Sequence, residues 1–303
     1  MTPERFWRSC HGVLRRLAWF AFACHVGIAL ALTEPVSATA LRGQYTRLQQ
    51  ALRNNPFGQP LVLQSAESAD GLTGDIYAVV PHPFAAVSEG MRSPDHWCEV
   101  MILHINTKYC HAVAGPQGTT LRVNIGKKTP QAIADATSVE FRYSETISTP
   151  AYFAITLSAK DGPLGTSDYR IRLEAVELAV NQSFLHLTYA YGVGFAGRLA
   201  MQTYLATLGA DKVGFTMVSP GSGAPPSHVA GVRGVVERNT MRYYLAIDSF
   251  LASQGEPPAA QLEQRLQAWF SAVERYPRQL HEVERSDYLA MKRAEVLRQQ
   301  TLY

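Results

Sequence analysis

The chain has 303 residues, 47% of them apolar and 10% aromatic, and its 28 basic residues nearly balance its 25 acidic ones. This length and composition are sufficient for one large domain with a sizeable core, or for one domain with an appendage. They exclude a nucleic-acid-binding protein that relies on a clustered excess of basic residues, so we expect no nucleic-acid partner.

The first 40 residues have the pattern of an export signal. Four arginines precede an apolar run from Leu17 to Leu32, and this run of about 16 residues is shorter than the roughly 20 that a membrane-spanning helix needs. Small residues follow, of which Ala38 and Ala40 fit the pattern that a signal peptidase recognises. We therefore expect cleavage after Ala40 and a periplasmic mature chain. The alternative is an uncleaved anchor that tethers the domain to the membrane.

Two of the four cysteines, Cys10 and Cys24, lie in the predicted signal, which leaves Cys98 and Cys110 in the mature chain. An even pair in an oxidising compartment predicts a disulfide. Their spacing fits neither a CxxC redox motif nor a zinc site. The alternative is two buried, unpaired thiols.

Residues 41–63 have apolar side chains at helical spacing and predict a short amphipathic helix that ends near Pro56. After this helix, seven segments alternate apolar and polar residues with a period of two, which is typical of strands with one buried face. Their inward-facing positions are Ile76, Ala78 and Val80; Leu103, Ile105, Thr107 and Tyr109; Leu121, Val123 and Ile125; Val139, Phe141 and Tyr143; Phe153, Ile155 and Leu157; Tyr169, Ile171, Leu173 and Ala175; and Leu185, Leu187, Tyr189 and Tyr191.

Such regular alternation favours an antiparallel sheet with one buried face, because parallel sheets read as continuous apolar runs. Turn sequences separate the later strands, so they form a meander. The connection between the first two strands is helical, and Pro94 divides it into two short helices. After the last strand, residues 234–251 predict a long amphipathic helix, which we expect to lie across the concave face of the sheet.

This order of elements resembles the START-like superfamily, also called SRPBCC or helix-grip proteins. The segment from Val80 to Trp97, with its Pro-His-Pro-Phe and Pro-Asp-His-Trp phrases, looks like the strand-helix opening of that family. The resemblance implies an α+β fold in which a seven-stranded curved antiparallel sheet grips a long helix, with extra N- and C-terminal helices. It also implies a space for an apolar or amphipathic molecule between sheet and helix.

The export pattern and the resemblance together predict that the chain has four parts. Residues 1–40 form the signal peptide, 41–73 an N-terminal helical segment and 74–253 the helix-grip domain, which contains an insertion at 209–234. Residues 254–303 form a C-terminal helical extension, in which 259–276 and 280–299 are the predicted helices. These last helices cap the domain or form a surface for a partner.

Residues that could carry out chemistry do not form a recognised pattern. The five histidines between His82 and His186 are scattered, and a GxGxxG match at Gly192–Gly197 follows a meander strand instead of opening a βαβ unit. Arginines such as Arg172 fall on the polar strand faces, where solvent exposure accounts for them. We therefore predict no catalytic residue, no metal and no cofactor.

The inward face is instead rich in tyrosine, which combines an apolar ring with a polar hydroxyl. We therefore predict a binding or carrier protein for a lipid or other hydrophobic molecule, with possible transient membrane contact. The alternatives are an enzyme on the same fold, with cyclase- or hydrolase-like activity, and a scaffold subunit with no ligand. The predicted ligand-binding residues are Tyr109, Phe141, Tyr143, Phe153, Tyr169, Leu187, Tyr189, Tyr191, Met241 and Leu245.

Overall fold

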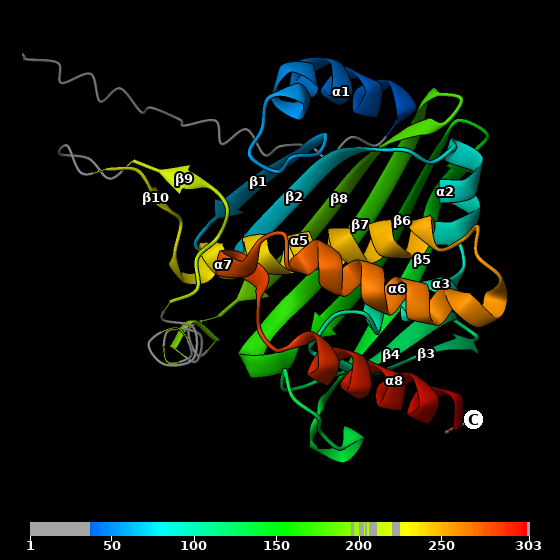
Figure 1. Ribbon diagram of the computed structural model, residues 1–303, viewed down its shortest axis with the longest axis vertical. Helices are drawn as coiled ribbons and strands as arrows, with labels where there is room; N and C mark the ends of the chain where they lie inside the picture. The colour runs from blue at the N-terminus through cyan, green and yellow to red at the C-terminus, as the bar shows by residue number, and fades with distance from the viewer. Residues whose placement is uncertain are drawn as a thin grey trace, which may run out of the picture. The chain divides into compact units, whose positions relative to one another are not determined.

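An eight-stranded antiparallel sheet with helices on both faces forms the body of the protein (Figure 1). The structure is a computed structural model that describes residues 37–194, 197–199, 203, 205, 211–219 and 225–301. The predicted export signal up to residue 36, most of the predicted helix after the GxGxxG match, and residues 209–210 and 220–224 of the insertion therefore lie outside the described residues. Within the described part of the chain, no helix has the length and apolar character needed to cross a membrane.

Helices and strands follow one another in the predicted order. The strands are β1 Leu61–Glu67, β2 Gly71–Val80, β3 Thr107–Gly115, β4 Gly118–Ile125, β5 Thr137–Thr149, β6 Tyr152–Asp161, β7 Thr166–Ala179, β8 Gln182–Val193, β9 Met217–Val218 and β10 Ser227–His228. The α-helices are α1 Ala38–Arg53, α2 Phe84–Met91, α3 Pro94–Met101, α5 Gly231–Ala252, α6 Pro258–Val273, α7 Pro277–Leu280 and α8 Arg285–Thr301. Two short 3-10 helices, Ile133–Asp135 and Pro163–Gly165, lie in the loops.

The strand order is β1-β2-β8-β7-β6-β5-β4-β3, with every neighbouring pair antiparallel. Strands β3 to β8 form the predicted six-strand meander, and β2 closes it against β8. The predicted α+β class, with a curved antiparallel sheet and a long helix, is confirmed. The sheet has one more strand than predicted, because β1 forms a hairpin with β2. The prediction that residues 61–67 belong to an N-terminal helical segment is therefore wrong.

Alternate residues of the sheet divide into two hydrophobic clusters. Positions such as Ile76 and Leu185 point into the main core, which α5 covers, whereas their neighbours Tyr77 and Phe184 point to the other face, which α1 covers. Gly74 is needed where β2 passes under α5, because a Cβ atom there would lie 2.2 Å from the Thr240 Oγ1. Figure 1 shows α5 crossing one face and α1 on the other.

The inward position predicted for Tyr109 is wrong. Strand β3 begins at Thr107, later than the predicted strand, and its register with β4 shifts between Thr107 and Tyr109. Such a bulge adds one residue and reverses the alternation beyond it. Cys110 therefore points into the core opposite Val123, and Tyr109 lies half-buried on the opposite face.

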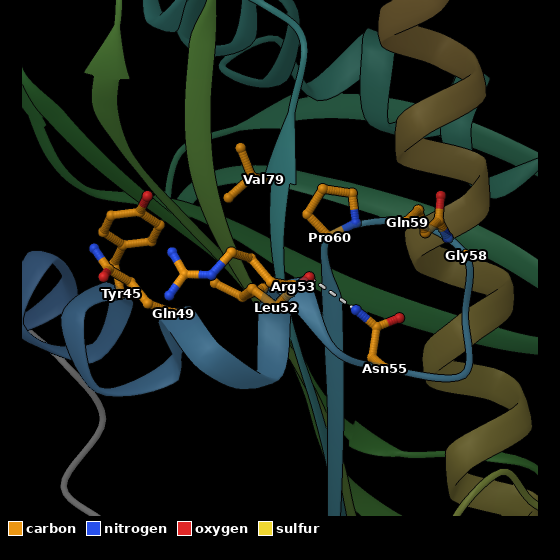
Figure 2. Close-up of a pocket in the computed structure, with 9 residues that line it drawn as sticks. All are labelled: Tyr45, Gln49, Leu52, Arg53, Asn55, Gly58, Gln59, Pro60 and Val79. Atoms are coloured by element: carbon orange, nitrogen blue, oxygen red, sulfur yellow. Dashed lines mark hydrogen bonds between the residues drawn. The ribbon is translucent and has the colours of Figure 1, made fainter.

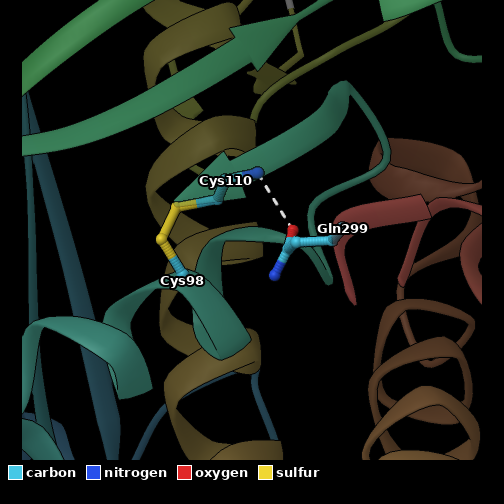
Figure 3. Close-up of a disulfide and its surroundings, with 3 residues drawn as sticks. All are labelled: Cys98, Cys110 and Gln299. Carbon is cyan, nitrogen blue, oxygen red and sulfur yellow. Dashed lines mark hydrogen bonds between the residues drawn. A yellow bond between two sulfur atoms is a disulfide. The ribbon is translucent and has the colours of Figure 1, made fainter. Parts of the chain in front are cut away.

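Cys98 of α3 and Cys110 of β3 form the predicted disulfide, which is thus confirmed as a pairing in the structure (Figure 3). The bond ties the second short helix to the edge strand of the sheet. The backbone N–H of Cys110 also donates to the Gln299 side chain of α8 at 2.9 Å. The C-terminal helix is therefore attached at the same point.

The C-terminal helices pack against the body, with α6 beside α5 and α8 beside β3. A buried ionic group joins α8 to β3. The ammonium groups of Lys108 and Lys292 lie 3.0 Å and 2.8 Å from the Glu295 carboxylate, and all three side chains are almost fully buried. Burial lowers the pKa of Lys292 to about 8, despite the opposing charge of Glu295. This group fixes the position of α8.

Candidate functional site

The centre of the space between the sheet and α5 is filled by side chains. Five of the predicted ligand-binding residues lie there, and each exposes 1% of its surface or less: Phe141, Phe153, Leu187, Met241 and Leu245. A cavity large enough to hold water would leave exposed area on its walls. A ligand therefore cannot occupy this central position without displacing those side chains.

Four tyrosines gather at one end of the same space, and we call this cluster the tyrosine end: Tyr169 on β7, Tyr189 and Tyr191 on β8, and Tyr243 on α5. The rings of Tyr169 and Tyr191 are stacked with centroids 5.2 Å apart, and Tyr189 lies 5.2 Å from Tyr243. The structure thus brings three predicted residues together and adds Tyr243. Helical periodicity placed the neighbouring residues 241 and 245 on the inward stripe and did not select Tyr243.

The hydroxyl groups of the tyrosine end are unequally satisfied. The Tyr169 hydroxyl lies 2.8 Å from the Thr166 hydroxyl, whereas the Tyr191 hydroxyl is buried and has no hydrogen-bond partner among the described residues. Burial, and then Tyr169, raise the pKa of Tyr191, while Arg238 opposes the rise. Tyr191 is therefore a neutral hydroxyl with an open hydrogen-bonding position close to a buried cation.

The remaining predicted residue, Tyr143, lies away from the tyrosine end, on strand β5. Tyr143 of β5 is half-buried at the α2 side, where its hydroxyl donates to the backbone oxygen of Arg92. Burial, and then Glu145, raise the pKa of Tyr143 to about 12. The hydroxyl of Tyr143 is thus already used in holding the end of α2.

A buried glutamate of α5 holds the described part of the insertion near the first turns of this helix. Glu237 accepts from the backbone N–H groups of Phe215 and Thr216 at 2.6 Å and 2.9 Å, and its other oxygen accepts from Ser65 at 2.5 Å. Gly214 lies against Gly234 of α5. Residues 211–219 are therefore fixed to α5 at Glu237, the residue directly before Arg238.

The described residues line a pocket and two grooves on the outside of the molecule. The pocket in Figure 2, of about 460 Å³, lies between α1 and the loop before β1, with Tyr45, Arg53 and Asn55 on its walls. A groove of about 760 Å³ runs over the polar face of the sheet near Arg142 and Arg170, and includes Tyr169 and Tyr191 at its edge. The other groove lies along α8.

The face of the sheet that is predicted to be polar contains a buried hydrogen-bond network. The prediction that solvent exposure accounts for Arg172 on this face is therefore wrong. His186 of β8 lies between two carboxylates, with its Nδ1 3.1 Å from Glu174 and its Nε2 2.9 Å from Asp75. Arg172 also donates to Glu174, at 3.0 Å, and the Tyr77 ring stacks on the imidazole. Periodicity assigns each of these residues to the polar face, but only the strand register shows that they meet.

The His186 network predicts a measurable pH dependence of stability. Burial would lower the pKa of His186, but the hydrogen bonds to Asp75 and Glu174 outweigh it and raise the pKa above its usual 6.5. The stabilisation from protonation is then complete below pH 6.5 and is lost as the pH rises through the folded value. His186→Gln should cost about 1.5–3 kcal/mol near pH 6 and less at pH 9.

Urea unfolding of both proteins across this range measures the difference. A cost that stays constant or grows with pH would contradict a protonated His186.

Glu174 makes the stability depend on pH in the opposite direction, at acidic pH. Burial would raise its pKa, but its bonds to His186 and Arg172 lower it, so its contribution is lost as the pH falls below 4.5 through the folded value.

No family model and no curated protein matches this chain. Solved structures do match. A conserved protein from Geobacillus kaustophilus has 11% identity and a TM-score of 0.34, and the match covers 60% of this chain and 95% of the other. Human StAR-related lipid transfer protein 5 has 7% identity and a TM-score of 0.31, covering 56% and 88%.

The Zhui aromatase/cyclase from Streptomyces sp. R1128 has 12% identity and a TM-score of 0.30, covering 73% of this chain and all of the other. These values are too low to assign a ligand or a functional residue to this chain. The fold itself is evident from the strand order, the two helices between β2 and β3, and the long helix on the inner face. The described residues thus have a helix-grip arrangement of sheet and helix, and the solved structures similar to the chain include StAR-related lipid transfer and aromatase/cyclase proteins.

Proposed function

We propose that this chain is an exported binding or carrier protein that holds an apolar or amphipathic small molecule at the tyrosine end. The ligand would lie against the rings of Tyr169, Tyr189 and Tyr243, with a polar group near Tyr191. The sequence predicts a ligand along the whole space between sheet and helix. Because the centre of that space is filled by side chains, we place the ligand at the tyrosine end only.

The observation that carries the proposal is the buried hydroxyl of Tyr191, which has no partner among the described residues. Leaving a buried polar group unsatisfied costs about 1–3 kcal/mol, so such groups are rare in folded proteins. A ligand with a hydrogen-bonding group at this point would remove the cost. The stacked rings around the hydroxyl offer apolar area for the rest of the molecule.

Export is supported by the sequence pattern of residues 1–40 and fits the Cys98–Cys110 pairing, since disulfides persist in oxidising compartments. A mature chain beginning near Leu41 would retain most of α1. The N-terminal helix would then pack on the sheet as described above.

A second candidate is a scaffold subunit that binds no small molecule. The five almost fully buried residues at the centre favour it, because they show how closely the interior is packed. Both candidate functions predict a stable helix-grip domain. They differ in that only the carrier protein binds a small molecule.

Replacing Tyr191 with phenylalanine distinguishes an anchor for a ligand from a structural hydroxyl. Because the hydroxyl makes no hydrogen bond to any residue that the structure describes, its removal should leave the stability unchanged or slightly higher. It should weaken ligand binding by about 0.5–1.5 kcal/mol, which is two- to tenfold in Kd. Tyr143→Phe is the matched control, since that hydroxyl bonds the Arg92 backbone, and it should lower stability with little effect on binding.

Native mass spectrometry of the wild-type and Tyr191→Phe proteins, purified from the periplasmic fraction, gives both the mass of any bound molecule and the first residue of the chain. The proposal predicts a start near Leu41 and a bound species that Tyr191→Phe retains less well. A ligand-free protein from every preparation favours the scaffold, and a full-length membrane-bound chain contradicts export.

A further inference from the structure

A groove on the outside of the domain lies between α8 and the loop at residues 128–132. Its volume is about 840 Å³, within the range of small-molecule sites. Most of its wall is apolar, and the side chains that form this wall are Pro130, Ala132, Val283, Ala290, Met291 and Ala294. The groove is separate from the tyrosine end, which lies between the sheet and α5.

Positive charge is in excess beneath this groove. Lys108 and Lys292 share the single carboxylate of Glu295, which also lines the groove. Arg298 lies close enough to lower the pKa of both lysines further, after the effect of burial. Three cations thus surround one carboxylate in a region from which water is largely excluded, where charges interact strongly.

Arg298 lies at the C-terminal end of the groove and directs part of this charge to its wall. One of its terminal nitrogens donates to the backbone oxygen of Gln131 at 3.1 Å, while the buried Nε has no partner among the described residues. The other carboxylate on the wall, Asp287, lies three helical turns away on α8, or roughly 16 Å. The other cation on the wall, Lys128, pairs with Glu282 at 2.7 Å, so the cations that share a single carboxylate lie at the Arg298 end.

We propose that this groove binds an amphipathic anion, with its apolar chain along Ala290 and Ala294 and its anionic group at Arg298. The apolar wall would cover the chain, and the excess positive charge would stabilise the head group. The terminal nitrogens of Arg298 have N–H groups besides the one that Gln131 accepts, and a guanidinium suits a carboxylate or a phosphate equally well. The same chain with a neutral or a positive head group should bind less tightly.

Three probes with one common chain test the charge requirement: dodecanoate and dodecyltrimethylammonium, each below its micellar concentration, and dodecanol below its solubility limit. Isothermal titration against the full mature chain should show dodecanoate binding at least tenfold more tightly than dodecanol, with the cation weakest. Arg298→Gln should reduce this preference at least threefold while leaving dodecanol binding unchanged. Dodecyl phosphate tests whether the head group can be a phosphate.

The substitution Ala294→Trp tests whether the probes bind in the α8 groove. Ala294 is exposed, so the indole fills the groove without entering the core, and dodecanoate affinity should fall at least tenfold. Gln300→Trp is the matched control, because Gln300 is an exposed α8 residue away from the groove wall, and it should bind normally.

Dodecanoate binding that Ala294→Trp leaves intact would overturn the proposal, as would equal affinity for all three probes or no binding. If Tyr191→Phe weakens dodecanoate binding and Ala294→Trp does not, the molecule belongs to the tyrosine end instead. The opposite result supports the α8 groove whether or not the tyrosine end holds a ligand.

Discussion

Replacing Glu295 with glutamine is expected to destabilise the folded chain by about 3–5 kcal/mol. The substitution leaves Lys108 and Lys292, both fully buried, without the carboxylate that lies 3.0 Å and 2.8 Å from them. Removing one partner of a buried ionic group costs this much because the remaining charge has lost its water and its counterion. Urea unfolding followed by tryptophan fluorescence measures the loss.

Glu263→Gln is the matched control for Glu295→Gln. Glu263 also pairs with a residue of α8, Arg293, at 2.7 Å, but both side chains are about half exposed. Exposed pairs contribute only about 0–1 kcal/mol, so this variant should unfold almost as the wild type does. Equal effects of the two substitutions would show that burial is not what makes the Glu295 group important.

Replacing Cys98 and Cys110 together with serine is expected to cost about 3 kcal/mol. The disulfide encloses a loop with a sequence separation of 12, and chain-entropy theory gives this value for such a loop. Adding a reductant should lower the stability of the wild type by a similar amount and leave the double variant unchanged. Guanidinium unfolding with and without reductant gives both values.

The pairing itself has a direct check. Peptide mapping without reduction should recover one fragment that contains both cysteines, from protein isolated outside the cytoplasm. Recovery of both as free thiols would contradict the disulfide and the proposed oxidising location together. Reductant sensitivity in the serine variant would indicate that another group is responsible for the change in stability.

The sequence determined the elements whose pattern is local. Period-two alternation located β2 and the last five meander strands but misplaced β3. Pro94 divided the helical connection into α2 and α3, and the apolar stripe from Val235 to Leu251 located α5 within a few residues. These signals are readable because each strand or helix must bury one face, whatever it packs against. The compartment inferred from residues 1–40 also gave a reason to pair Cys98 with Cys110.

Only the tertiary structure decided which residues meet. The bulge before Tyr109 reversed a face, the register of β7 and β8 placed Glu174 beside His186, and the packing of α8 put Lys108 next to Glu295. Residues far apart in the chain are brought together by register and packing, which depend on all the strands and helices at once. For the same reason, periodicity could list inward tyrosines but could not show that the centre is filled and that Tyr191 alone among them keeps an unsatisfied hydroxyl in the described part of the chain.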